Sequence, residues 1–203
     1  MLGAVKNISK WLIISCYLPL ALAPSYVVAN DIELGLDHYR NGDYKSAMAH
    51  WRPLAETGDE VAEFYLGIMY ENGRAVSQDA GQAAIWYRRA ADQNLAKAQY
   101  YLSRLYSDGR GVAQDNALAV MWLRRAASQN YPEAQRALSL KYTLGEGVPQ
   151  DYLRAYMWLT LATRAGAKID PQAKKFLEHQ LAGTLAKAQQ MARACEDNNF
   201  QDC

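Results

Sequence analysis

The sequence carries almost no excess of charge of either sign. Twenty-two Lys and Arg residues stand against twenty-one Asp and Glu residues, which leaves a formal net charge of +1. A chain without a basic surplus has no global field that attracts nucleic acid or an anionic membrane surface. Any recognition by charge must therefore come from a local patch, and we expect no nucleic-acid partner.

Sequence motifs of catalysis and of tightly held cofactors are also missing. The chain contains no G-x-S-x-G, H-E-x-x-H or Walker loop, and neither S-x-x-K nor K-T-G. Its three histidines, His38, His50 and His179, are isolated in sequence. The sequence therefore predicts no enzyme, no cofactor and no zinc or haem site.

The first 29 residues have the pattern of an export signal. Two lysines within the first ten residues precede an apolar run over residues 11–23, and small side chains end at Ala29, so we expect cleavage before Asn30. A retained membrane anchor and a lipoprotein acylated at Cys16 stay open as alternatives. With cleavage, the protein is expected to be exported to the periplasm without stable membrane insertion.

Cysteine is scarce, and only Cys195 and Cys203 remain after such a cleavage. An oxidising compartment favours a disulfide between such a pair, although two free surface thiols stay open as an alternative. A bridge here would close a short loop and fix the C-terminus.

A repeat with a period of 36 residues dominates the rest of the chain. An eight-residue glycine-containing segment ends at Asp79, Asp115 and Asp151, and counting back gives Asp43 as the start of a first copy. Other residue types follow the same step: Trp86, Trp122, Trp158; Tyr70, Tyr106, Tyr142; Ala62, Ala98, Ala134; Leu66, Leu102, Leu138. Self-similarity at this period indicates stacked helical units.

Each copy is predicted to fold as two short amphipathic helices, because its apolar residues recur at helical spacing. The periodic aspartates stand where an N-cap is needed. One residue in each copy is expected to form the turn between the two helices: Gly58, Asn94, Asn130 and Gly166. The periodic Trp and Tyr residues are interpreted as core rather than as a ligand-stacking surface.

The unit reads D-x-x-x-A-x-x-W-x-x-x-A followed by A-x-x-x-L-x-x-x-Y-x-x-G-x-G-V-x-x-D, and it is carried most completely over residues 115–151. This pattern resembles the Sel-one-like repeats, relatives of the tetratricopeptide repeats. The resemblance implies a right-handed α/α solenoid of about four helix pairs with a C-terminal capping helix. It also implies a scaffold that binds a protein or peptide partner.

The predicted organisation has four parts. A signal peptide covers 1–29, a lead-in helix covers 30–42, the repeats cover 43–166, and a capping helix with a disulfide tail covers 167–203. The repeats divide into 43–78, 79–114, 115–150 and a partial copy, 151–166.

Some positions depart from the repeat. Ala75 occupies a place that glycine fills in the later copies, at a cost of about 1 kcal/mol if the residue is left-handed. Pro53 suggests a short or kinked first helix. The capping helix is expected to break at Gly183-Thr184 and to be apolar on the side of Phe176 and Leu177.

Arginines recur at the same step and are the candidate partner-binding residues: Arg52, Arg88, Arg89, Arg124 and Arg125. They follow the aromatic core positions and are expected to point off the core face. They would either be solvated and paired locally, for example Arg88 with Asp92, or form a strip that receives carboxylates. Three functions stay open: an envelope interaction scaffold, an enzyme or binder acting on cell-wall peptides, and a self-associating assembly protein.

Overall fold

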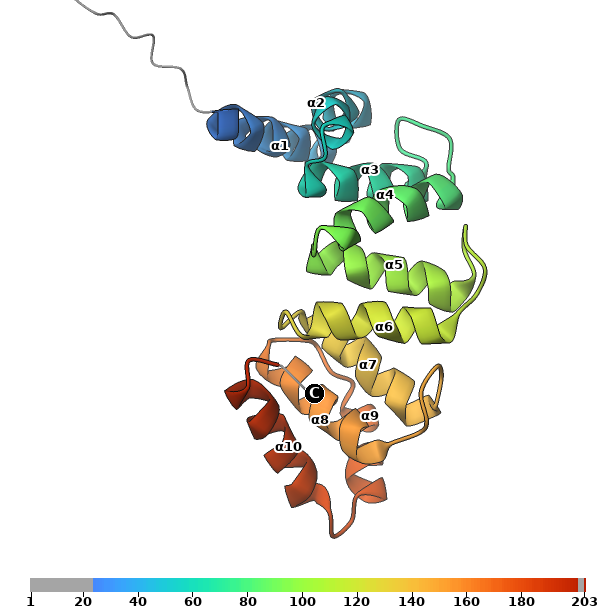
Figure 1. The fold of residues 1–203 in the computed structure, drawn as a ribbon, viewed down its shortest axis with the longest axis vertical. Coiled ribbons are helices and arrows are strands. Elements are labelled where there is room, and N and C mark those ends of the chain that lie inside the picture. Colours follow the sequence, from blue (N-terminus) through green and yellow to red (C-terminus); the bar gives the residue numbers. More distant parts are fainter. Residues whose placement is uncertain (1–23, 201–202) are drawn as a thin grey trace, which may run out of the picture.

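The structure is a computed structural model that describes residues 24–200 and residue 203. Within these residues the chain forms ten α-helices and no strand, which confirms the predicted all-α class. The helices follow one another from α1 to α10 as an elongated solenoid of helix pairs (Figure 1). Their bounds are α1 Pro24–Arg40, α2 Tyr44–Glu56, α3 Glu60–Asn72, α4 Ala80–Asp92, α5 Ala96–Asp108, α6 Asn116–Ala127, α7 Pro132–Leu144, α8 Tyr152–Arg164, α9 Pro171–Gln180 and α10 Leu185–Asp197.

The first helix of each repeat begins at an aspartate, as predicted. Each aspartate side chain accepts a hydrogen bond from the backbone N–H three residues further on, at 2.9 to 3.2 Å: Asp43, Asp79, Asp115 and Asp151. The bond satisfies one of the donors that a helix start leaves without an intrahelical partner.

Left-handed residues separate the helices at regular places. The second helices of three repeats end at glycines with φ of 64°, 65° and 72°: Gly73, Gly109 and Gly145. The four residues predicted to punctuate the turn within each pair all have positive φ: Gly58, Asn94, Asn130 and Gly166. These turns reverse the chain and set the antiparallel helix pairs side by side.

The loops between repeats pack on the preceding repeat. A Cβ added at Gly111 would lie 2.2 Å from the Ala80 carbonyl carbon, and one added at Gly147 would lie 2.2 Å from the Asn116 carbonyl oxygen. Glycine is therefore required at both places by close backbone approach as well as by its positive φ. Ala75 stands at the equivalent place with φ of 61°, which confirms the left-handed conformation considered for it.

The periodic aromatic residues form the core, as their spacing predicts. Trp51, Trp122 and Trp158 are buried, and Trp86 is half-buried. Tyr87 lies one repeat after Trp51 and is fully buried. Packing thus accounts for most of the aromatic content.

Helix α1 docks on α2 as an additional helix of the solenoid. The indole N–H of Trp51 donates to the carbonyl oxygen of Ile32 at 3.3 Å. The cleavage predicted before Asn30 falls within α1, and the basic and apolar parts of the predicted signal, with Cys16, lie outside the described residues. Among the described residues, no helix is long and apolar enough to cross a bilayer.

Pro53 does not shorten its helix, so the expectation of a short helix is wrong. Helix α2 has 13 residues, the same length as α4, and continues past the proline to Glu56. Pro53 stands in the last turn, where the missing N–H removes a single bond close to the helix end.

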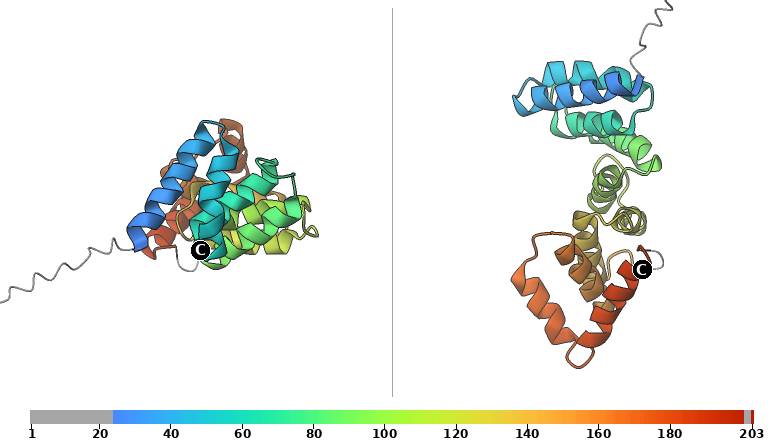
Figure 2. Two further views of the ribbon diagram at one scale, coloured as in Figure 1. Left: turned by 90° about the horizontal axis from the view of Figure 1, so that it is seen from above. Right: turned by 90° about the vertical axis from the view of Figure 1, so that its left-hand side faces the viewer.

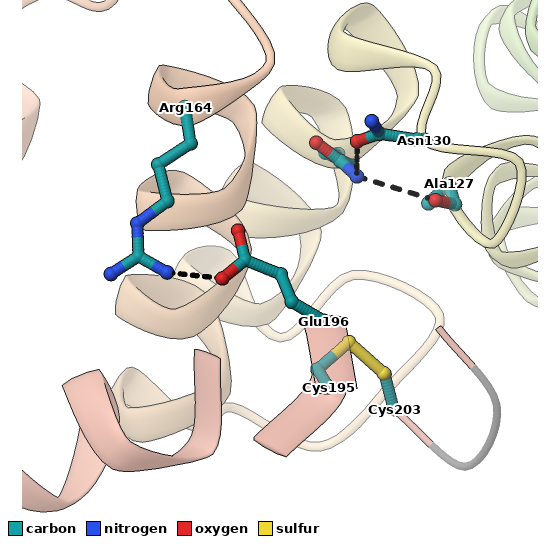
Figure 3. Close-up of a disulfide and its surroundings, with 7 residues drawn as sticks. Ala127, Asn130, Arg164, Cys195, Glu196 and Cys203 are labelled. Atoms are coloured by element: carbon teal, nitrogen blue, oxygen red, sulfur yellow. Dashed lines mark hydrogen bonds and ion pairs between the residues drawn. A yellow bond between two sulfur atoms is a disulfide. The ribbon is translucent and has the colours of Figure 1, made fainter. Parts of the chain in front are cut away.

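The predicted capping helix is two helices, α9 and α10, separated at the expected Gly183-Thr184 break. Leu177 is buried, but Phe176 is 44% exposed, so its predicted place on the buried side is wrong. Adjacent helical residues differ by about 100° in direction, and α9 buries only the face of Leu177. A disulfide joins Cys195 of α10 to Cys203, with their Cα atoms 5.6 Å apart (Figure 3).

Candidate functional site

Arg88 and Arg124 occupy equivalent positions beside a tyrosine of the next helix, with Arg88 half-buried and Arg124 exposed. Arg88 donates to the Tyr106 hydroxyl, and its guanidinium lies 5.5 Å from the ring centres of Tyr106 and Trp122. Arg124 donates to the Tyr142 hydroxyl at 2.6 Å. The expected pairing of Arg88 with Asp92 is therefore wrong, and Arg88 is half-buried rather than turned away from the core. A tyrosine within reach on the next helix replaces a pairing along the same helix.

The other three candidate arginines differ from these two. Arg52 is exposed, and its guanidinium contacts the Met48 sulfur at 3.3 Å. Arg89 forms an ion pair of 3.1 Å with buried Glu63, and Arg125 stacks over Trp122 at 4.7 Å. Three of the five, Arg52, Arg88 and Arg124, stand at equivalent positions 36 residues apart. We call the surface that carries Arg52, Arg88 and Arg124 the arginine face.

The arginine face contains a cavity that recurs with the repeat. A cavity of about 290 Å³ lies at Arg52 and one of about 540 Å³ at Arg88. Six lining positions of the first reappear 36 residues later in the second: 45, 48, 49, 52, 53 and 75, then 81, 84, 85, 88, 89 and 111. Arg124 lines a third cavity of about 440 Å³ with Tyr142, Arg154 and Cys203.

Exposed apolar side chains accompany the arginines. Ile85 is 52% exposed and lies in the cavity of Arg88, and Met121, its equivalent one repeat later, is 36% exposed. Sequence reasoning missed both, although their 36-residue separation is visible in the sequence. The arginine face therefore offers guanidinium donors and apolar contact area together.

The buried ionisable groups of the repeats serve packing. The Tyr87 hydroxyl donates to Glu71 at 2.7 Å, and Arg110 bridges to the same carboxylate at 3.0 Å. Burial and the neighbouring Glu71 raise the pKa of Tyr87. This network ties α3, α4 and the loop after α5 together, and it holds Tyr87 as a neutral donor.

Two histidines on consecutive helices meet where α1 packs on α2. The rings of His38 and His50 stack with centres 5.5 Å apart, and His50 lies 3.3 Å from the carboxylate of Asp31. Among the described residues, no group of three or more His, Cys, Asp or Glu side chains could hold a metal ion. The pair helps to hold α1 in place.

The repeated helix pairs, their aspartate caps and their glycine loops match a known family. A model of the Sel1 repeat fits three consecutive units, at residues 61–95, 96–131 and 132–166. The chain belongs to the Sel1 repeat family. A search of curated proteins found no match.

Solved structures of Sel1 repeat proteins share the fold. One is a protective antigen of uropathogenic Escherichia coli strains that displays an SLR fold, with 32% identity, a TM-score of 0.69 and coverage of 82% of this chain. This chain spans 38% of the antigen's length. Another is a Sel1 repeat protein from Oxalobacter formigenes, with 28% identity, a TM-score of 0.68, and coverage of 79% of this chain and 67% of that one.

The Sel1 units begin half a repeat later than the units predicted from the aspartates. Each matched unit pairs a second helix with the following first helix, for instance α3 with α4. Helix α3 also packs more extensively on α4 than on α2. A period fixes the length of a repeat and leaves its starting point open. Sel1 repeats mediate protein–protein interaction, and family members are typically non-catalytic scaffolds.

Proposed function

We propose that this protein is a periplasmic, non-catalytic scaffold or regulator that binds an acidic segment of a protein or peptide partner on the arginine face. The observation that carries the proposal is the recurrence of one cavity at Arg52 and Arg88, with the same six lining positions in consecutive repeats. A surface that repeats its chemistry at a fixed step suits an elongated partner segment.

The arginines favour carboxylates as the partner's contacting groups. The tyrosine hydroxyls bound by Arg88 and Arg124 occupy part of each guanidinium and hold it in place. The remaining N–H donors are then preorganised for bidentate contact with a carboxylate. Ile85 and Met121 add apolar area, so the favoured segment carries apolar side chains among its acidic ones.

The periplasmic location rests on the N-terminal pattern of residues 1–29, since a lysine-rich start, an apolar run and small residues form the signature of an export signal. A compartment that permits disulfides also agrees with the bridge between Cys195 and Cys203. Detection of the mature N-terminus by mass spectrometry of the envelope fraction tests cleavage before Asn30.

The partner is tested by crosslinking in intact cells, followed by binding measurements with the purified partner. The variant Arg52→Glu/Arg88→Glu/Arg124→Glu is compared with Lys97→Glu/Lys168→Glu/Lys187→Glu, which makes the same charge change at exposed lysines outside these cavities. We expect the arginine variant to weaken binding by at least about tenfold, because each charge-assisted contact contributes about 1.5 kcal/mol or more, and the lysine variant to bind as the wild type does.

Equal losses in the two variants would show that net charge, and not the arginine face, recognises the partner. Circular dichroism melts of both variants verify folding, because Arg88 and Arg124 also bond to tyrosines. Concentration-dependent self-association of the wild type that the arginine variant abolishes would instead make a second copy of the chain the occupant.

A further inference from the structure

The C-terminal cap contains a cavity that is separate from the arginine face. It has a volume of about 380 Å³ and lies between α8, α9 and α10. Figure 2 (right) shows α9 and α10 diverging from the turn that joins them. Eight residues line the cavity: Tyr156, Leu159, Thr160, Thr163, Arg164, Lys174, Gln189 and Arg193.

Each of the three helices contributes one cation to this cavity, and two of the three are already matched by a carboxylate. Arg164 pairs with Glu196 at 2.5 Å (Figure 3), and Lys174 lies 3.8 Å from Glu178. Arg193 has no hydrogen bond or ion pair among the described residues. The cavity therefore has one positive charge in excess, which a ligand with a single negative charge would neutralise.

Two threonines of α8, Thr160 and Thr163, also line the cavity. The hydroxyl of Thr160 donates to the Tyr156 carbonyl oxygen at 2.8 Å, and that of Thr163 donates to the Leu159 carbonyl oxygen at 2.7 Å. Because each hydroxyl proton is already used within α8, a threonine oxygen can act toward a ligand only as an acceptor. A complementary ligand must therefore carry N–H donors close to its negative charge.

We infer that this cavity binds the free carboxyl end of a short peptide. The carboxylate pairs with Arg193, and the peptide N–H groups donate to the oxygens of Thr160 and Thr163. The volume falls within the range of small-ligand pockets and is too small for a folded partner. The buried Leu159 leaves an apolar wall for one small side chain.

The probe is acetyl-alanyl-alanine with a free carboxyl group, and its matched control is the same dipeptide with a C-terminal amide. We expect the acid to bind saturably, with shifts of the amide signals of Thr160, Thr163 and Gln189 in NMR titrations. Loss of one charge-assisted pair costs about tenfold in affinity or more, so the amide binds at least about tenfold more weakly.

Variants of the protein test whether the peptide binds in the cavity or elsewhere on the surface. Arg193→Gln should weaken binding of the acid by about tenfold, whereas Lys187→Gln, at an exposed position of the same helix outside the cavity, should leave it unchanged. Thr163→Val should weaken binding of the dipeptide but not of acetate, because acetate has no N–H donor to lose a partner. Thermal melts verify that each variant folds.

The inference fails if the acid produces no saturable shifts, or if acid and amide bind equally. It also fails if Lys187→Gln loses as much affinity as Arg193→Gln, or if inorganic phosphate binds as tightly as the acid. Equal binding of phosphate would make the cavity a general anion site.

Discussion

Gly35 of α1 lies so close to Trp51 of α2 that a Cβ added to the glycine would stand 2.2 Å from the indole nitrogen. The same relationship recurs one repeat later, where a Cβ at Gly67 would stand 2.5 Å from the ring of Tyr87. Helix α1 therefore uses the packing of a repeat helix, although it lies upstream of the residues matched by the Sel1 model.

Gly35→Ala should destabilise the protein by about 1–3 kcal/mol, because the methyl group must displace the buried indole ring. Urea denaturation followed by tryptophan fluorescence measures the loss. Glu33→Ala, at an exposed position of the same helix, is the control and should change stability by less than about 0.5 kcal/mol. Equal stability of the two variants would mean that α1 does not dock on Trp51.

Ala75→Gly should stabilise the protein by about 1 kcal/mol, since an alanine at φ of 61° is strained and glycine is not. The reverse change at the equivalent place, Gly111→Ala, should destabilise by more than that, because its methyl group meets the Ala80 backbone as well. Chemical denaturation of both variants measures whether each change raises or lowers the free energy of unfolding. A loss of stability in Ala75→Gly would contradict the assignment of strain.

The repeat, the caps and the turns could be predicted from the sequence because each depends on residues close together in the chain. Asp79 caps a helix that starts at the next residue, and Asn94 turns the chain where it stands. Because the repeats are 36 residues apart, each local prediction then applies to the equivalent residue of every other repeat.

The side-chain contacts of the arginines could not be predicted from the helix spacing. Arg88 and Tyr106 are 18 residues apart on different helices, so only the packing of the helices brings them together. The first repeat breaks the pattern, since Arg52 contacts Met48 instead. The cavity at the C-terminal cap is completed by Lys174 of α9 and by Gln189 and Arg193 of α10, which lie beyond the last repeat, so the period does not predict it.

Ala165→Gln should stabilise the protein by about 1 kcal/mol by satisfying a buried acceptor. In the preceding repeat, the Gln129 side chain donates to the side-chain oxygen of Gln99 at 2.9 Å. One repeat later, Ala165 stands in place of Gln129 and Gln135 in place of Gln99, and the side-chain oxygen of buried Gln135 has no partner. The matched control Ala165→Glu is of similar size but has no amide donor, so it should give no gain. Thermal denaturation compares the two variants, and an equal gain in both would attribute the effect to packing.

The variant Glu63→Gln should gain stability relative to wild type as the pH rises. Burial raises the pKa of Glu63 despite its ion pair with Arg89, so ionisation is harder in the folded chain than in the unfolded one. Gln99 and Gln135 occupy the equivalent places in the next two repeats, which shows that the amide fits there.

The sign follows from linkage. A carboxyl group with a raised folded pKa contributes stability below its unfolded pKa of about 4.3, and that contribution is lost as the pH rises through the folded value. The glutamine variant has no such loss, so its free energy of unfolding relative to wild type should increase between about pH 4 and pH 7. Urea denaturation at both pH values measures the difference. If the difference fell with rising pH, the ion pair between Glu63 and Arg89 would outweigh the cost of burying the carboxylate.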